Sequence, residues 1–250
     1  MADILSEIGL LTMVGLAATI LLAAILRAFT GFGFALAALP ILSLVLAPTT
    51  AASVIVLLTL TVSLQTIRSY WKDVPIKDMA GMIVTSAIGT LFGTYLLLIF
   101  SPDMFRLLIG GTVMLACFLL ARYKPAPHRA GGMFGLWSGL TSGLLNGALA
   151  IPGPPVIIYS MAVYDRARVA RAFLMGFFLF SAAFAATSYT VEGIIGMKEL
   201  TLFTVCYPAM LIGNRTGDWL FEKYGDASHR PIAIWALFAI GLSVAAAAIF

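Results

Sequence analysis

Long apolar runs separated by short polar segments fill almost the whole chain. The runs fall at about 8–26, 34–47, 50–67, 79–100, 104–121, 131–145, 153–164, 172–190, 199–221 and 231–249. Only 10% of the residues are charged, whereas a soluble domain carries roughly 25%. A soluble fold of this length could not bury so much apolar surface. The sequence therefore predicts an all-α polytopic membrane protein.

Two of the runs, 34–47 and 153–164, are too short to cross a bilayer comfortably, because a span needs roughly 20 residues. Each follows a motif in which a hydroxyl residue and a glycine precede a proline by the same spacing. The motifs are Thr30-Gly31 before Pro40, and Ser142-Gly143 before Pro152. Glycine lacks the Cβ that enforces a right-handed helix, and proline removes an amide donor. Both places therefore predict broken or half-membrane helices.

The second motif carries two more prolines, Pro154 and Pro155. A residue before proline is disfavoured in the helical region, so we expect Pro154 to be extended. The second interruption is therefore predicted to be the more severe one.

The two halves of the chain share a second pattern. A glycine pair four residues apart occurs as Gly89 and Gly93 and again, at a fixed offset, as Gly213 and Gly217. Such pairs let membrane helices approach closely. At the same offset Arg106 matches Arg230. We therefore predict one transmembrane domain, 1–250, made of two repeats, 1–124 and 125–250. Each repeat has about five helical segments, an odd number, so the repeats should be inverted.

The basic residues predict the orientation in the membrane, because they gather on the cytoplasmic side. If the segments alternate, one face collects Arg106 and Lys198 only. The other face collects Arg68, Lys72, Lys77, Arg122, Lys124, Arg129, Arg166, Arg168, Arg171, Lys223 and Arg230. That face is predicted to be cytoplasmic, with both termini on the non-cytoplasmic side. No basic stretch precedes the first apolar run, so we expect a retained helix rather than a cleaved signal peptide.

The interrupted helices are the predicted binding site, since two broken segments at matching places in two half-chains point to a transporter's substrate site. A helix that restarts after a break exposes backbone N–H groups and the positive end of its dipole, which both favour anions. The candidate substrate-binding residues are Arg27, Thr30, Gly31, Phe32, Gly33, Ser142, Gly143, Asn146, Gly147 and Arg215.

Arg215 has two interpretations. A charged residue inside an apolar run is costly and is a functional hypothesis by default. Asp218 stands three residues further on and Glu222 one more turn along, so Arg215 could instead neutralise Asp218. Asp218 is also the one evident carboxylate that could carry a coupling proton. Arg27 ends the first apolar run and could either extend to a membrane surface or border the first interruption. We favour the place beside the interruption.

Several classes of function find no support in the sequence. The acidic residues and the two histidines lie almost all in loops or at the ends of runs, and no P-loop or haem pattern is present. Cys117 and Cys206 fall inside apolar runs without metal-like spacing. We therefore expect no metal, no cofactor, no enzymatic activity and no nucleic-acid partner.

The twin motifs, together with small-residue helices after each and a basic linker in mid-chain, resemble the TauE/SafE sulfite exporter family. This family is also called the toluene sulfonate uptake permease family, and the resemblance covers essentially the whole chain. It implies a carrier of the bacterial inner membrane for a small anion such as sulfite, sulfoacetate or another organosulfonate, driven by an ion gradient.

The resulting hypothesis is a secondary anion transporter with alternating access around the two interrupted helices. One alternative is a gated anion channel built on the same elements, and another is a membrane subunit that does not transport. The expected partners are the small anion and the lipid bilayer, and the protein is expected to be a monomer or a homodimer.

Overall fold

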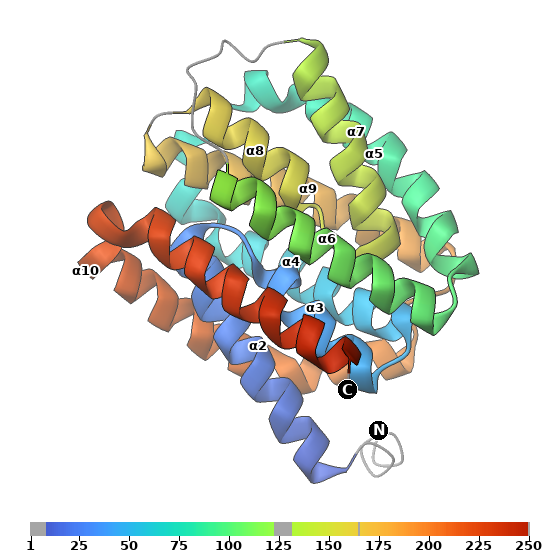
Figure 1. The fold of residues 1–250 in the computed structure, drawn as a ribbon. Helices are drawn as coiled ribbons and strands as arrows, with labels where there is room; N and C mark the ends of the chain where they lie inside the picture. The colour runs from blue at the N-terminus through green and yellow to red at the C-terminus, as the bar shows by residue number, and fades with distance from the viewer. Residues whose placement is uncertain (1–8, 123–131, 165, 250) are drawn as a thin grey trace.

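The computed structural model describes residues 9–122, 132–164 and 166–249, and these residues form helices without any strand. Figure 1 shows the arrangement. The helices are α2 (Leu10–Thr30), α3 (Phe34–Val45), α4 (Pro48–Tyr70), the short 3-10 helix η1 (Trp71–Asp73), α5 (Ile76–Ile99), α6 (Pro102–Arg122), α7 (Met133–Leu149), α8 (Gly153–Val163), α9 (Ala167–Val191) and α10 (Met197–Ile249). The all-helical prediction is confirmed for the described part.

Four helical segments of the described residues are long and apolar enough to cross a membrane, namely Leu11–Thr30, Pro48–Asp73, Ile76–Ile99 and Arg168–Val191. The two runs predicted to be short form the short apolar helices α3 and α8, of 12 and 11 residues. At 1.5 Å per residue they reach about 16–18 Å, roughly half of a 30 Å hydrocarbon core.

The first interruption lies between α2 and α3, and we call residues 31–33 the first break. Gly31 and Gly33 both have positive φ, +83° and +92°, in the left-handed region that glycine adopts without strain. Pro40 was predicted to belong to this interruption, but it lies inside α3. At its seventh position proline leaves the helix intact, so the glycines alone make the break.

The second interruption lies between α7 and α8, and we call residues 150–152 the second break. Ala150 ends α7 in the left-handed conformation with φ +53°, and Pro152 precedes α8. The expected extended Pro154 is wrong, because α8 begins at Gly153 and includes both Pro154 and Pro155. The first turn of a helix tolerates proline, since its N–H groups have no intrahelical acceptor.

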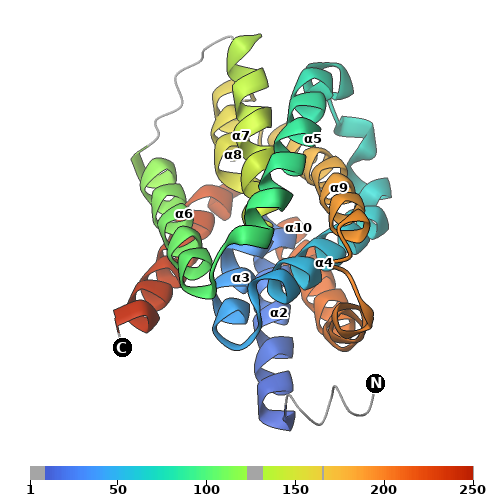
Figure 2. The same cartoon turned by 90° about the vertical axis from the view of Figure 1, so that its right-hand side faces the viewer.

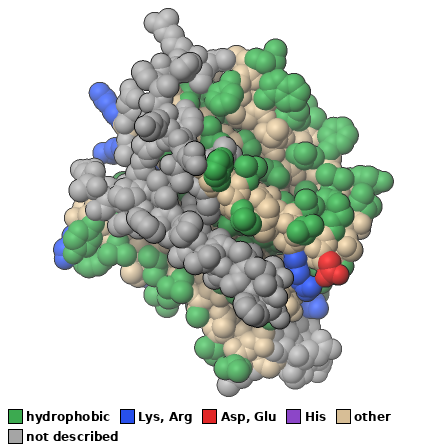
Figure 3. Space-filling view, in the orientation of Figure 1, with side chains coloured by type: hydrophobic (Ala, Val, Ile, Leu, Met, Phe, Trp, Pro, Cys, Tyr) green, Lys and Arg blue, Asp and Glu red, His purple; other side chains and the backbone are tan. Residues whose placement is uncertain are grey.

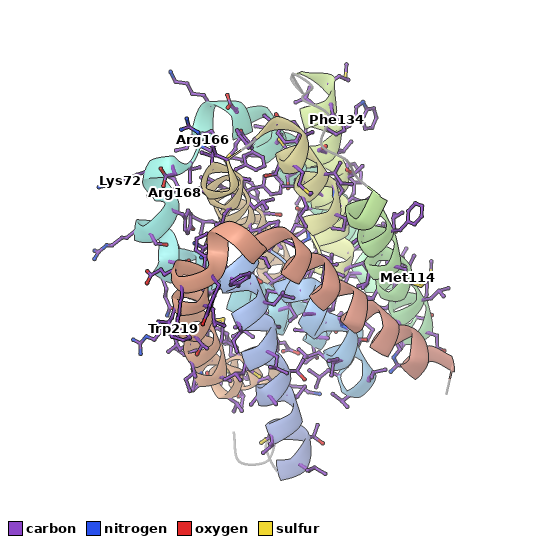
Figure 4. All side chains as sticks on the ribbon, turned by 60° about the vertical axis from the view of Figure 1, so that its left-hand side comes forward. Lys72, Met114, Phe134, Arg166, Arg168 and Trp219 are labelled. Atoms are coloured by element: carbon purple, nitrogen blue, oxygen red, sulfur yellow. The ribbon has the colours of Figure 1, made fainter. Side chains whose placement is uncertain are left out.

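The last two predicted segments, 199–221 and 231–249, belong to one continuous helix in the structure, α10. Figure 4 shows that the α10 ribbon bends into two arms. Two arms agree with two separate apolar runs in the sequence. The predicted repeat boundary at residues 124 and 125 lies outside the described residues, as do Lys124, Arg129 and both ends of the chain.

Helices far apart in sequence pack in two close pairs, α5 with α7 and α2 with α10. The predicted glycine pairs lie at these contacts. A Cβ on Gly89 or Gly93 would overlap the α7 backbone, and one on Gly213 or Gly217 would crowd the α2 backbone. The glycine pairs therefore have the same role in both halves, whereas the inverted relation of the halves stays a prediction.

Figure 2 shows α7 and α8 in the upper part of the molecule and α2 and α3 in the lower part. The two breaks therefore approach each other from opposite sides. Figure 3 shows hydrophobic side chains spread across the described part of one face. Leu91, Phe92 and Tyr95 of α5 are about two-thirds exposed, as expected for a helix that faces lipid.

Candidate functional site

Both breaks line one small cavity. The first break and the start of α3 supply Phe32, Gly33, Phe34, Ala35 and Leu36. The second break and the start of α8 supply Ile151, Pro152 and Gly153. Arg27 of α2, Thr59 of α4 and Phe178 of α9 complete the walls. The cavity volume is about 30 Å³. On the same measure one water molecule needs roughly 10–15 Å³, so the cavity has room for about two water molecules.

Arg27 supplies the charge of this cavity. Its side chain is buried, with 1% of its surface exposed. Nη2 donates a hydrogen bond of 2.9 Å to Ser63 Oγ, whereas Nε and Nη1 are buried without a hydrogen-bond partner. Unpaired buried donors are costly, and more so when they carry charge. Nε and Nη1 of Arg27 could therefore each donate to an additional hydrogen-bond acceptor.

No carboxylate neutralises Arg27 within the described part of the chain. The ion pairs there are Arg106–Asp103, Arg168–Asp73 and Arg171–Asp218. A buried cation without an anionic partner is unfavourable in membrane protein interiors. An anion bound in the cavity would supply the missing charge.

The two helix starts at the cavity differ in the donors that they offer. α3 has no side-chain cap, and its first intrahelical acceptor, the carbonyl of Gly33, bonds to the Ala37 N–H at 2.9 Å. The N–H groups of Phe34, Ala35 and Leu36 thus have no intrahelical acceptor. In α8 proline occupies positions 154 and 155, so Gly153 alone offers an N–H ahead of Val156. The first break therefore offers more free backbone N–H donors than the second.

The hydroxyl groups of the two predicted motifs bond to backbone inside the protein. Thr30 Oγ1 lies 2.8 Å from the carbonyl oxygen of Leu26 and 2.7 Å from that of Phe32, and it accepts a bond from the Phe32 N–H. Ser142 Oγ donates to the carbonyl oxygen of Pro152. Each hydroxyl thus holds the chain across its break, and neither lines the cavity.

The other candidates of the second motif lie in packed contacts. Asn146 Nδ2 donates to the Ser181 carbonyl oxygen at 2.8 Å and to Ser181 Oγ at 2.9 Å. A Cβ on Gly143 would overlap the Ser86 carbonyl, and one on Gly147 would overlap the α5 backbone near Thr90. In the structure Ser142, Gly143, Asn146 and Gly147 therefore hold α7 in place, and the second break itself reaches the cavity.

Arg215 is exposed on α10 and does not line the cavity. It does not neutralise Asp218 either, because Asp218 Oδ1 pairs with Arg171 Nη2 at 2.8 Å. The interpretation of Arg215 as the partner of Asp218 is therefore wrong. The proton-carrying role of Asp218 remains a prediction, as does a substrate contact at Arg215.

Comparison with known proteins gives the family. A family model described as "Sulfite exporter TauE/SafE" matches residues 16–244. The chain belongs to the TauE/SafE family. It is also similar to a probable sulfite/organosulfonate exporter TauE of Cupriavidus necator, with 26% identity over 243 residues and 94% of each chain covered. No solved structure matches the chain. TauE/SafE proteins are membrane transporters, so the chain is a transporter and not an enzyme.

Several residues at or near the cavity of this TauE/SafE protein were not predicted as site residues from the sequence. Some adjoin the breaks, namely Phe34, Ala35, Leu36, Ile151 and Gly153, and others lie on α4 and α9, namely Thr59, Ser63, Tyr70 and Phe178. Tyr70 donates from its hydroxyl to the Ser63 carbonyl oxygen at 2.7 Å, and Ser63 accepts from Arg27. Ser63 and Tyr70 stand seven residues apart, two helical turns, on one face of α4. That spacing of polar groups in an apolar run is the signal that could have identified them.

Arg171 was predicted only as one of the basic residues on the cytoplasmic face, and that side of the membrane stays a prediction. The structure adds that its side chain is only 16% exposed and pairs with Asp218. Figure 4 shows Lys72, Arg166 and Arg168 close together on the outside of the molecule. Among the described residues, no group of three or more His, Cys, Asp or Glu could hold a metal ion. The site chemistry is therefore that of a buried guanidinium and backbone amides.

Proposed function

We propose that the protein is a secondary transporter that binds a small anion, sulfite or an organosulfonate, in the cavity between the two breaks. The observation that carries this proposal is Arg27. Its guanidinium is buried, has two donors without a partner and lies in a cavity lined by both breaks. The family and the name of the Cupriavidus necator relative supply the chemical class of the anion.

The cavity suits an oxyanion with a short apolar portion. Arg27 and the free N–H groups at the start of α3 supply donors and positive charge for the oxygen atoms. Phe32, Phe178 and Ile151 supply apolar walls on the other side. Because these groups come from α2, α3, α9 and the two breaks, movement of one half against the other would open the cavity towards one side of the membrane at a time.

We further propose the predicted orientation, with both termini on the non-cytoplasmic side of the bacterial inner membrane. The gathering of Lys72, Arg166 and Arg168 at one place on the surface supports it. Cysteines introduced one at a time at Lys72 and Lys198 should then become accessible to an impermeant thiol reagent from opposite sides of the membrane. The cysteine at Lys198 should react in intact cells, and the cysteine at Lys72 only after the cells are opened. Reaction of both from the same side would contradict this orientation.

Sulfite binding to the purified protein tests the substrate assignment. A ligand at a hundredfold excess over its Kd stabilises the protein by about 2.7 kcal/mol. We expect sulfite or an organosulfonate such as sulfoacetate to raise the melting temperature, and chloride to raise it much less. Arg27→Gln should abolish the shift, because it removes the buried charge.

Arg168→Gln is the matched control, since Arg168 pairs with Asp73 far from the cavity and is mostly exposed. It should keep the full shift. A sulfite shift that survives in Arg27→Gln would contradict the proposal. In proteoliposomes, saturable counterflow of labelled sulfite is the result expected of a carrier, whereas anion currents without exchange would identify a gated channel.

A further inference from the structure

Arg171 joins three helices at the end of α2. Its Nη2 donates to the carbonyl oxygen of Ala28 at 2.5 Å and to Asp218 Oδ1 at 2.8 Å. Arg171 belongs to α9, Asp218 to α10 and Ala28 to the last turn of α2. One guanidinium therefore connects the two long helices to the turn that carries Arg27.

The rest of the Arg171 side chain lies against the first break. A Cβ on Gly31 would stand 2.7 Å from Arg171 Cγ, so the stem packs directly on this glycine. The guanidinium carbon lies 4.1 Å from the centre of the Phe221 ring, which in turn packs edge-on against Phe29 at 6.1 Å. A cation above an aromatic face is favourable. We call Arg171, Asp218 and Phe221 the clamp.

The clamp supplies a hydrogen bond that the backbone does not. The Gly31 N–H bonds to the carbonyl of Arg27, and the Phe32 N–H bonds to Thr30 Oγ1. The Ala28 carbonyl therefore takes its hydrogen bond from Arg171. A cation is also favourable at the C-terminal end of a helix. Without the clamp, the last turn of α2 would be free to fray.

We propose that Arg171 and Asp218 are positioning residues for the anion site. They fix the last turn of α2 and with it the direction in which Arg27 points its free donors. Asp218 acts by holding the Arg171 guanidinium, and neither residue touches the anion. This inference rests on the proposed function, since it concerns the same cavity.

The test compares sulfite affinity in Arg171→Gln, Asp218→Asn and the double variant, by calorimetry well below the melting temperature. Each single variant should weaken sulfite binding about tenfold, because it releases the same turn of α2. The double variant should be no weaker than the worse single one, since coupled residues of one unit are not additive. Arg171→Lys keeps a charge and a donor and should recover part of the affinity. Arg168→Gln, with its own ion pair on the same helix, should bind as the wild type does.

A purely structural role would lower the melting temperature of the ligand-free protein and leave the affinity unchanged. That result in Arg171→Gln or Asp218→Asn would overturn the inference. If the Arg171→Gln protein does not insert into the membrane, the sulfite affinities of Asp218→Asn and Arg171→Lys provide the test, because both replacements are close to the native residues in size. If Arg27→Gln loses sulfite while the clamp variants keep it, the clamp inference alone fails. If Arg27→Gln itself binds sulfite normally, the proposed function fails.

Discussion

Gly143 of α7 lies so close to Ser86 of α5 that a Cβ on the glycine would overlap the Ser86 carbonyl oxygen. Gly139 and Gly147, one turn to either side, meet α5 in the same way. Backbone approaches backbone along this whole face, as is usual for helix pairs in lipid. The glycines of the second motif thus serve helix packing, and the structure leaves no room there for a ligand.

We therefore expect Gly143→Ala to destabilise the protein by about 1–3 kcal/mol, the typical effect of inserting bulk into a packed core. Gly110→Ala in α6 is the control, because a Cβ at that position meets nothing within 4 Å. Alanine there should be neutral or slightly stabilising, since it favours helix. The melting temperature in detergent measures both. Equal melting of Gly143→Ala and wild type would show that α5 and α7 can separate at little cost.

The sequence predicted the short helices well, because glycine and proline act locally. α3 and α8 match the predicted runs 34–47 and 153–164 closely. α3 begins after Gly33, which has the left-handed conformation, and α8 begins after Pro152. The shared spacing from glycine to proline was less informative. The first break lies at the glycines of its motif, and Pro40 lies inside α3. The second break lies at the proline of its motif, and Gly143 lies inside α7.

The site was only partly predictable, because the same residue type serves two purposes. Arg27 lies in the last turn of α2 and lines the cavity beside the first break, and its part in substrate binding stays a prediction. Glycine can admit a ligand or another helix, and a hydroxyl can bind an anion or a carbonyl. The local sequence does not distinguish these uses for Gly143 or Ser142. Arg171 was missed because its partners, Ala28 and Asp218, come from helices distant in the sequence.

Ser63→Ala tests how the Arg27 guanidinium is held. Ser63 Oγ accepts a hydrogen bond of 2.9 Å from Arg27 Nη2. Without the Ser63 hydroxyl, Arg27 Nη2 loses its hydrogen-bond partner, as Nε and Nη1 already lack one, and the guanidinium can change its orientation. We expect sulfite affinity to fall several-fold, in line with the roughly 0.5–1.5 kcal/mol net value of one hydrogen bond.

Ser53→Ala on the same helix is the control for Ser63→Ala. Ser53 is fully buried and its hydroxyl has no hydrogen-bond partner. Removing an unsatisfied hydroxyl is neutral or stabilising. Sulfite titration of both variants should therefore separate them. Equal affinity in the two would mean that Ser63 does not orient Arg27.

Ser142→Ala tests the link across the second break. The variant leaves the Pro152 carbonyl without its donor from α7. A buried acceptor that loses its partner typically costs about 1–3 kcal/mol, so we expect a lower melting temperature. Thr141→Ala, whose hydroxyl bonds to the Trp137 carbonyl on the exposed side of the same helix, should change stability little. A Ser142→Ala protein as stable as Thr141→Ala would remove this link from the account of the second break.

Arg215→Gln should leave both stability and sulfite affinity near their wild-type values. The side chain is exposed, and surface substitutions away from special features usually change stability by less than about 0.5 kcal/mol. Asp218→Asn, three residues along α10, should in contrast lower affinity because Asp218 holds Arg171. Sulfite titration distinguishes them. Loss of binding in Arg215→Gln would place Arg215 on the substrate path after all.

Gly31→Ala separates backbone strain from packing at the first break. Gly31 has φ +83°, where a Cβ costs roughly 1–2 kcal/mol, and its Cβ would also press on Arg171 Cγ. Gly193→Ala carries the same kind of strain, with φ +70°, but its Cβ would meet nothing within 4 Å. Backbone strain should lower the melting temperature of both variants by similar amounts. Gly31→Ala should melt lower still, because its Cβ also presses on Arg171.

The difference between these two variants measures how tightly Arg171 is seated on the first break. Gly31→Ala should also weaken sulfite binding, because displacing Arg171 releases the turn that carries Arg27, whereas Gly193→Ala should leave binding unchanged. If the two variants lose equal stability and both bind sulfite normally, Arg171 yields easily to an added methyl group. The end of α2 would then be held by Gly31 and Thr30 alone.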